Sequence, residues 1–295
     1  MPNHKASSSN WHDWSTVHHF FKPLEKPLEI YVFIDPTCPS CFRLDRTLKR
    51  LKLEYGHYFA LKHVFSKQTH TRLPEKSRTS QSGISCEKLW IEKEFAGHIT
   101  SIAIKAAELQ GKKAGYRYFK KIQESLFINQ ECVDALDTLL TCAEKADIDY
   151  DEFVRDLQSD SAIKALECDL KITEEMDVQD LPSLVFFNQK MEEEGIKVAG
   201  SYPYEIYVQI LEEILGFQPK ANALPALEEC AKEFEVVTTS ELSYIYQMEP
   251  HEVEREMKKL MLKQAVEHIP RRSETVWRYR EKKKKALLLY YIKIK

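Results

Sequence analysis

A segment near the N-terminus, EIYVFIDPTCPSCF (residues 29–42), constrains the fold more than any other part of the chain. Residues 28–34 form a short apolar run that is rich in β-branched and aromatic side chains and bounded by Asp-Pro, which is typical of a buried strand. After the two cysteines, apolar residues recur at helical spacing and a glycine follows: Leu44, Leu48, Leu51, Tyr55 and Gly56. The segment therefore predicts a strand, a Cys-x-x-Cys pair and a helix in direct succession.

The position of Cys38 and Cys41 at a helix start predicts thiol chemistry. Cysteines three apart lie on one face of the first turn, where the helix dipole and free backbone N–H groups favour a thiolate. We expect Cys38 to be the exposed nucleophile and Cys41 to be the deeper, resolving thiol, while Pro39 suits the first helical turn. A zinc site would need a second ligand pair, and the sequence has no other CxxC and no HxxxH.

The order of the next elements predicts an α/β fold of the thioredoxin-like type. We expect a second strand at 58–65, a helical block at 97–176, strands in LPSLVFFN and GIKVAGS, and a closing helix that ends at Gly216. The strand–helix–strand unit implies a parallel pair with a right-handed crossover, and the last two strands can form a hairpin on the same sheet. Pro182 opens the third strand, where thioredoxin folds carry a cis-proline facing the cysteines, although a proline at a strand start is also common for steric reasons.

The C-terminal part of the chain predicts a small second domain. Helices in ALEECAKEFEVV, TTSELSYIYQ and HEVEREMKKLMLKQAV, followed by a hairpin in EHIPR and ETVWRYR, give the layout of a winged helix. The expected organisation is a His-rich arm (1–26), a thioredoxin-like domain (27–217) with a helical insertion (about 95–176), a proline-containing linker (218–226) and a winged-helix-like domain with a basic tail (227–295).

Composition excludes several classes of protein. No apolar run reaches the roughly 18–20 residues of a bilayer span, and the first thirty residues contain no continuous apolar signal segment. From the lack of both patterns we expect a cytoplasmic protein. A net charge of −3 gives no global attraction to nucleic acid or an anionic membrane. Seven cysteines in a chain with an ample core do not fit a secreted disulfide scaffold. The five outside the pair are expected to be small buried hydrophobes: Cys86, Cys132, Cys142, Cys168 and Cys230.

Histidines in the N-terminal arm are the candidates for a metal. Imidazole groups, with a carboxylate from Asp13, are ligand types that zinc accepts. Their spacing follows no closed structural site, so we expect no cofactor and keep zinc binding by the arm as an alternative. The histidines are His4, His12, His18 and His19.

Four segments carry a specific resemblance: KPLEIYVFIDPTCPSCF, KAAELQGKKAGYRYFKKIQESLF, SAIKALECDLKITEEMDVQDLPSLVFFN and EEGIKVAGSYPYEIYVQILEEILG. Together they resemble the SpxH family, also called YjbH, over residues 26–216 and more loosely beyond. The resemblance implies a DsbA-related cytosolic adaptor of Gram-positive bacteria that binds the stress regulator Spx and presents it to the ClpXP protease. It also implies that Cys38 and Cys41 are the DsbA-type pair and that Pro182 is the facing cis-proline.

Two residues depart from the pattern of a DsbA-type oxidase. Ser40 lies where a histidine is usual within the CxxC, and Leu181 precedes the proline where Val or Thr is more usual. We therefore expect an adaptor and no enzyme. The alternative is a cytosolic thiol–disulfide oxidoreductase or redox sensor that uses the cysteine pair.

A third hypothesis is DNA binding through the winged-helix-like domain. The presumed recognition helix carries Glu252, Glu254 and Glu256 in its first turns, where these charges would oppose phosphate and base edges. The basic run at 282–285 could still meet phosphate or an acidic protein. We expect no nucleic-acid partner.

Overall fold

The computed structural model describes residues 26–67, 96–188, 195–269, 271 and 274–280. The sequence predictions for the histidines of the arm, for Cys86 and for the basic run at 282–285 lie outside these residues. Among the described helices, none has the length and apolar character needed to cross a bilayer.

A four-stranded sheet in the order β2-β1-β3-β4 forms the centre of the larger part. Strand β1 (Leu28–Ile34) pairs in parallel with β2 (Phe59–Phe65), so the predicted crossover unit is confirmed. Strands β3 (Ser183–Asn188) and β4 (Ile196–Ala199) form the predicted antiparallel hairpin, and β3 pairs antiparallel with β1. The central position of β1 explains why its side chains are mostly buried on both faces of the sheet.

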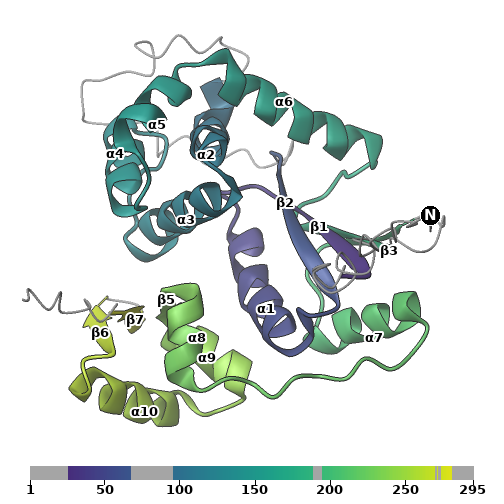
Figure 1. Cartoon of the computed structure of the whole chain (residues 1–295), viewed down its shortest axis with the longest axis vertical. Helices are drawn as coiled ribbons and strands as arrows, with labels where there is room; N and C mark the ends of the chain where they lie inside the picture. The colour runs from purple at the N-terminus through teal and green to yellow at the C-terminus, as the bar shows by residue number, and fades with distance from the viewer. Residues whose placement is uncertain (1–25, 68–95, 189–194, 270, 272–273, 281–295) are drawn as a thin grey trace, which may run out of the picture.

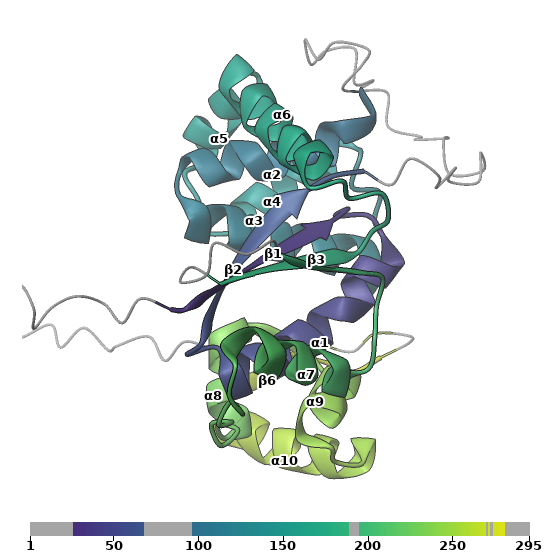
Figure 2. The same cartoon turned by 90° about the vertical axis from the view of Figure 1, so that its right-hand side faces the viewer.

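Helices cover both faces of this sheet, as Figure 2 shows edge-on. One face carries α1 (Pro39–Tyr55) and α7 (Tyr204–Leu215), and α7 ends at Gly216 in a left-handed conformation (φ 71°) that favours glycine. The other face carries the helical insertion, which confirms the predicted helical block. Its elements are η3 (Ala96–His98), α2 (Ile99–Leu109), α3 (Lys112–Gln123), the π-helical η4 (Glu124–Ile128), α4 (Leu136–Lys145), α5 (Tyr150–Leu157) and α6 (Asp160–Glu175).

The C-terminal unit, residues 227–280, has its own hydrophobic core around Trp277. Its elements are α8 (Leu227–Phe234), β5 (Val236–Thr238), α9 (Thr239–Tyr246), α10 (Pro250–Leu262), β6 (Val266–Ile269) and β7 (Val276–Tyr279). The strands form an antiparallel sheet in the order β5-β7-β6. The predicted succession of helices and a hairpin agrees with these elements. Helix α9 begins at a capping box, in which Thr238 and Glu241 cap each other's backbone N–H groups.

Strand β5 was missed by the sequence analysis. The predicted helix through ALEECAKEFEVV is wrong in its last residues, because α8 stops at Phe234 and Glu235 has a positive φ of 61°. The β-branched Val236 and Val237 then pair with β7 instead of continuing the helix.

Two of the isolated cysteines contradict the prediction of burial. Cys142 and Cys230 are buried, but Cys132 and Cys168 are exposed. Cys168 lies on the outer face of α6, whose buried residues are Ala162, Leu166, Asp169 and Thr173. Cys132 lies in the connection between η4 and α4, outside any helix.

Candidate functional site

The cysteine pair is positioned by a tight turn between β1 and α1. The Cys38 N–H donates to the Asp35 carbonyl at 3.1 Å, which closes a turn with Pro36 at its second position. The Asp35 carboxylate accepts from the Thr37 N–H at 2.8 Å and from the Thr37 hydroxyl at 2.7 Å. Cys38 is the N-cap of α1 and Pro39 its first residue, so the sequence DPTCP turns the chain directly into the helix.

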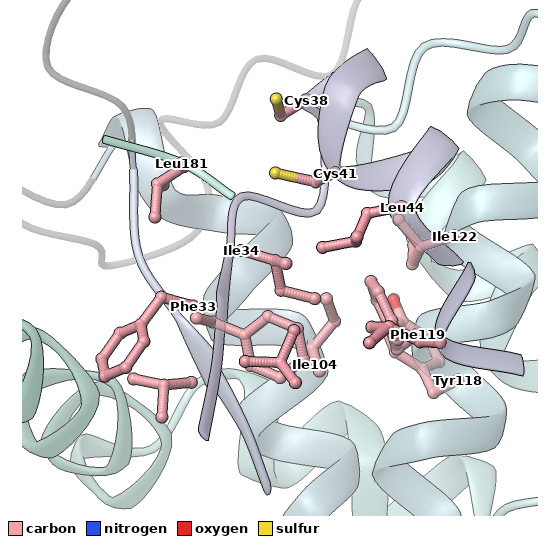
Figure 3. Close-up of a cluster of buried hydrophobic side chains, with 14 of the residues drawn as sticks. Phe33, Ile34, Cys38, Cys41, Leu44, Ile104, Tyr118, Phe119, Ile122 and Leu181 are labelled. Carbon is pink, nitrogen blue, oxygen red and sulfur yellow. The ribbon is translucent and has the colours of Figure 1, made fainter. Parts of the chain in front are cut away.

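Both cysteines are free thiols and both belong to the main hydrophobic core. The predicted exposure of Cys38 is wrong: the residue is 7% exposed, and Cys41 is 4% exposed. In Figure 3 the Cys41 sulfur points towards Leu181, with Ile34 and Leu44 beneath it, and the Cys38 sulfur lies above Cys41, farther from these side chains.

The surroundings of Cys38 favour its thiolate. A hydrogen bond from the Cys41 thiol is the main reason that the pKa of Cys38 falls to about 5; burial opposes this shift and the Ser40 hydroxyl adds to it. The Ser40 oxygen lies 2.9 Å from the Cys38 sulfur. The same hydrogen bond to Cys38, followed by burial, raises the pKa of Cys41 above its usual range. The lowered pKa thus belongs to Cys38 and the raised pKa to Cys41, while their roles as nucleophile and resolving thiol stay a prediction.

Alkylation of Cys38 by iodoacetamide is expected to follow a pH curve with its midpoint near 5, far below the value of about 8.5 for an ordinary thiol. Ser40→Ala removes one hydrogen bond to the thiolate and should move this midpoint upward by about one pH unit. Peptide-level mass spectrometry measures the rates, and the exposed Cys168 in the same digest serves as a control. An unchanged midpoint in Ser40→Ala would show that Ser40 does not stabilise the thiolate.

The Leu181–Pro182 peptide bond is cis. Leu181 is buried in the same core as the cysteines, and the Pro182 carbonyl accepts from the Gly200 N–H at 2.7 Å, which ties the start of β3 to the end of β4. In Figure 3, Leu181 lies on the side of the core towards which the Cys41 sulfur points. Cys38, Cys41 and Leu181, the residue before the cis-proline, thus share one core, while Pro182 as the residue that faces the cysteines stays a prediction.

A buried ionic cluster connects α1 to the rest of the molecule. We call it the α1 clamp: Asp45, Lys49, Lys120 and Glu241. Lys49 bridges Asp45 at 3.2 Å and Glu241 of α9 at 2.8 Å, and Lys120 of α3 binds Asp45 at 2.6 Å. Burial opposes both charges, but Lys120 and Lys49 hold the pKa of Asp45 below its usual range, and Glu241 and Asp45 raise the pKa of Lys49.

Further contacts join α1 to the C-terminal unit. Tyr244 binds the Thr47 hydroxyl at 3.1 Å and lies under the Arg46 guanidinium at 4.6 Å. At the end of α1, the Asn222 N–H donates to the Glu54 carbonyl at 2.8 Å, so part of the expected linker lies against the helix. The helix that starts at the cysteine pair therefore also carries part of the contact between the two parts of the molecule.

No group of three or more histidine, cysteine or acidic side chains in the described part of the chain is arranged to hold a metal ion. The histidines proposed as zinc ligands lie outside that part. Zinc binding by the arm therefore stays a prediction.

A parallel strand–helix–strand unit, a CxxC at the start of the helix and a cis-proline define a thioredoxin-like protein of the DsbA type. Comparison with known proteins agrees: a family model described as Thioredoxin matches residues 31–209. A solved structure from Nitrosomonas europaea, described as a candidate protein disulfide isomerase, aligns with a TM-score of 0.50 and 19% identity over 64% of this chain and 98% of its own, which supports the fold alone.

The chain belongs to the SpxH family. It is 43% identical over 275 residues to a protein of Halalkalibacterium halodurans described as "ClpXP adapter protein SpxH", a match that covers 87% of this chain and 90% of that protein. A Bacillus subtilis protein with the same description is 40% identical over 86% of this chain and 90% of its own length. A Bacillus cereus protein with that description is 38% identical over 96% of this chain and 99% of its own length.

Proposed function

We propose that this protein is a cytosolic adaptor that binds the regulator Spx and promotes its degradation by ClpXP. The observation that carries the proposal is the similarity, over nearly the whole length of both chains, to proteins described as ClpXP adapters. Such a match includes the C-terminal unit as well as the thioredoxin-like part. An adaptor acts by raising the effective concentration of its cargo at the protease, and this requires binding surfaces and no bond chemistry.

A thiol–disulfide function is the second candidate, and the lowered pKa of Cys38 favours it. A stabilised thiolate makes the dithiol form more stable, so the pair would rest reduced in a reducing cytosol. In that state it could reduce or isomerise disulfides, or report oxidation by closing a Cys38–Cys41 disulfide. Adaptor and sensor functions are compatible, because α1 connects the cysteines to the C-terminal unit.

An ATP-dependent time course of Spx degradation by ClpXP tests the proposal. We expect the wild-type protein to accelerate degradation by at least about threefold, as a tether does. Cys38→Ala/Cys41→Ala should accelerate it equally if recognition is independent of the thiols. Cys132→Ala/Cys168→Ala, which changes two exposed cysteines elsewhere, is the matched control.

Each other outcome has a separate meaning. Acceleration lost only in Cys38→Ala/Cys41→Ala, with its folding confirmed by circular dichroism, would place the thiols inside the mechanism. No acceleration by the wild-type protein would reject the adaptor function. An insulin-reduction assay would then decide whether the pair is a working oxidoreductase.

A further inference from the structure

A groove of about 800 Å³ lies between the helical insertion and the C-terminal unit. Its lining residues come from α3, η4 and the end of α4 on one side and from α8, β5 and β7 on the other; in Figure 1, α3 and α4 lie above α8, β5 and β7. Six basic side chains line it: Arg117, Lys121, Lys145, Lys232, Arg271 and Arg278. Three acidic side chains, Glu124, Asp147 and Glu235, also line it. The groove is therefore positive although the whole chain has a net charge of −3.

Much of this positive charge is not neutralised by the protein itself. Lys121 and Arg278 bind Glu124 at 3.1 and 2.7 Å, which accounts for one carboxylate. Lys145, Lys232 and Arg271 are exposed and form no ion pair with any described residue. Cations on the walls of a cleft add their fields, so an anionic group in the groove is attracted more strongly than one at a flat surface.

Arg117 adds a fixed positive charge to the groove wall. Its guanidinium donates to the carbonyl oxygens of Ala146 at 2.9 Å and of Asp147 at 2.6 Å. These hydrogen bonds hold the side chain in place between α3 and the end of α4. A carbonyl oxygen carries only a partial charge, so the full positive charge of Arg117 still acts on the groove.

We propose that this groove binds an acidic peptide segment of the cargo protein, which rests on the adaptor function proposed above. The mixed walls favour a peptide over nucleic acid. A phosphate backbone carries a charge at every nucleotide and would meet the carboxylates of Glu124, Asp147 and Glu235. A peptide can place its carboxylates beside the lysines and arginines and its main-chain N–H groups beside the acidic residues.

The groove has one wall from each part of the molecule. Arg117, Lys121 and Lys145 belong to the insertion, whereas Lys232, Arg271 and Arg278 belong to the C-terminal unit. A segment bound there contacts both parts at once. The site consequently exists only in the full chain, with its two parts docked through α1.

The test reverses two exposed, unpaired charges of the groove, in Lys232→Glu/Arg271→Glu. The matched control, Lys164→Glu/Lys220→Glu, makes the same change in net charge at exposed residues that do not line the groove. Fluorescence anisotropy measures the binding of two probes, Spx and a labelled octapeptide of alternating Glu and Ala. The same octapeptide with Gln in place of Glu is the uncharged control for the second probe. We expect the groove variant to bind Spx and the Glu peptide at least about tenfold more weakly, and the control to change by less than about twofold.

Salt dependence provides a second readout. Raising NaCl from about 50 to about 300 mM should weaken the wild-type complexes and should weaken those of the groove variant less, because fewer charge contacts remain to be screened. Circular dichroism and thermal melts of both variants should match those of the wild type, since neither changes a buried residue.

Equal affinity of the groove variant and the wild type for both probes would overturn the proposal. A single-stranded oligodeoxynucleotide that binds the wild type more tightly than the Glu peptide, and loses affinity in the groove variant, would assign the groove to nucleic acid instead. Failure of Spx to bind the wild type would reject the adaptor function. The Glu peptide would then still show whether the groove selects acidic peptide.

Discussion

Replacing Lys49 with methionine is expected to lower the free energy of unfolding by about 3–5 kcal/mol, because it removes the cation that pairs with Glu241 and one of the two that pair with Asp45. Lys49 is only 6% exposed and lies between Asp45 and Glu241. Methionine keeps much of the side-chain volume, so the loss of stability reflects the missing positive charge and not a cavity. Urea unfolding monitored by circular dichroism measures the change.

Two controls separate the clamp from a general effect of removing a lysine. Lys171→Met breaks an exposed pair with Glu175 at 3.7 Å and should cost less than about 0.5 kcal/mol. Lys49→Met/Glu241→Gln should recover part of the loss, because the amide carries no charge and can still accept the Thr238 N–H at the start of α9. If Lys49→Met were no less stable than Lys171→Met, the clamp would contribute nothing.

The pKa shifts in the α1 clamp predict the pH range over which the clamp stabilises the folded protein. The pKa of Asp45 is lowered in the folded state, so its stabilisation is complete above the unfolded value of about 4 and is lost as the pH falls below it. The pKa of Lys49 is raised, so its stabilisation is complete below about 10.4 and is lost as the pH rises above it. The difference in stability between wild type and Lys49→Met should therefore be largest between about pH 4 and pH 10.

Trp277→Ala is the second substitution with a large expected effect, a loss of about 3–5 kcal/mol from the stability of the C-terminal unit. The side chain is fully buried in the core of that unit, and its indole N–H donates to the Thr239 hydroxyl at 3.0 Å. Alanine leaves a cavity and an unpartnered hydroxyl. Thermal unfolding should show a lower transition temperature.

Trp277→Phe is the matched variant. Phenylalanine fills most of the space but cannot donate to Thr239, so the expected loss is about 1–2 kcal/mol. The difference between the two variants measures packing, and the loss in Trp277→Phe measures mainly the hydrogen bond. Equal losses in both would mean that the hydrogen bond, and not the packing, dominates at this position.

The first part of the site could be predicted from the sequence because its signals are local. The apolar run of β1, Pro39 at the helix start and Gly56 after the helix end lie within thirty residues of one another. Each fixes its own piece of backbone without help from distant residues. The sheet order and the helical insertion follow from the succession of such local signals.

The α1 clamp could not be predicted in this way. Asp45 and Lys49 are four apart on a helix, a spacing that is typical of a solvent-exposed pair. Their burial depends on Glu241, which is 192 residues from Lys49 along the chain. The break between α8 and β5 was missed for a related reason, because Glu235 adopts a positive φ that its sequence neighbours do not indicate. Such features depend on tertiary packing and leave no periodic trace.

Helix α1 contacts both the helical insertion and the C-terminal unit. This arrangement matters when shortened chains are used to locate a binding surface. A fragment that ends near residue 217 would lack Glu241 and Tyr244, and the faces of Lys49 and Thr47 that these residues cover would meet water. The helix that begins at Cys38 would then be perturbed along its length. Loss of activity in such a fragment would report a damaged α1 as readily as a missing surface. Point substitutions in the intact chain are therefore the sound way to map where partners bind.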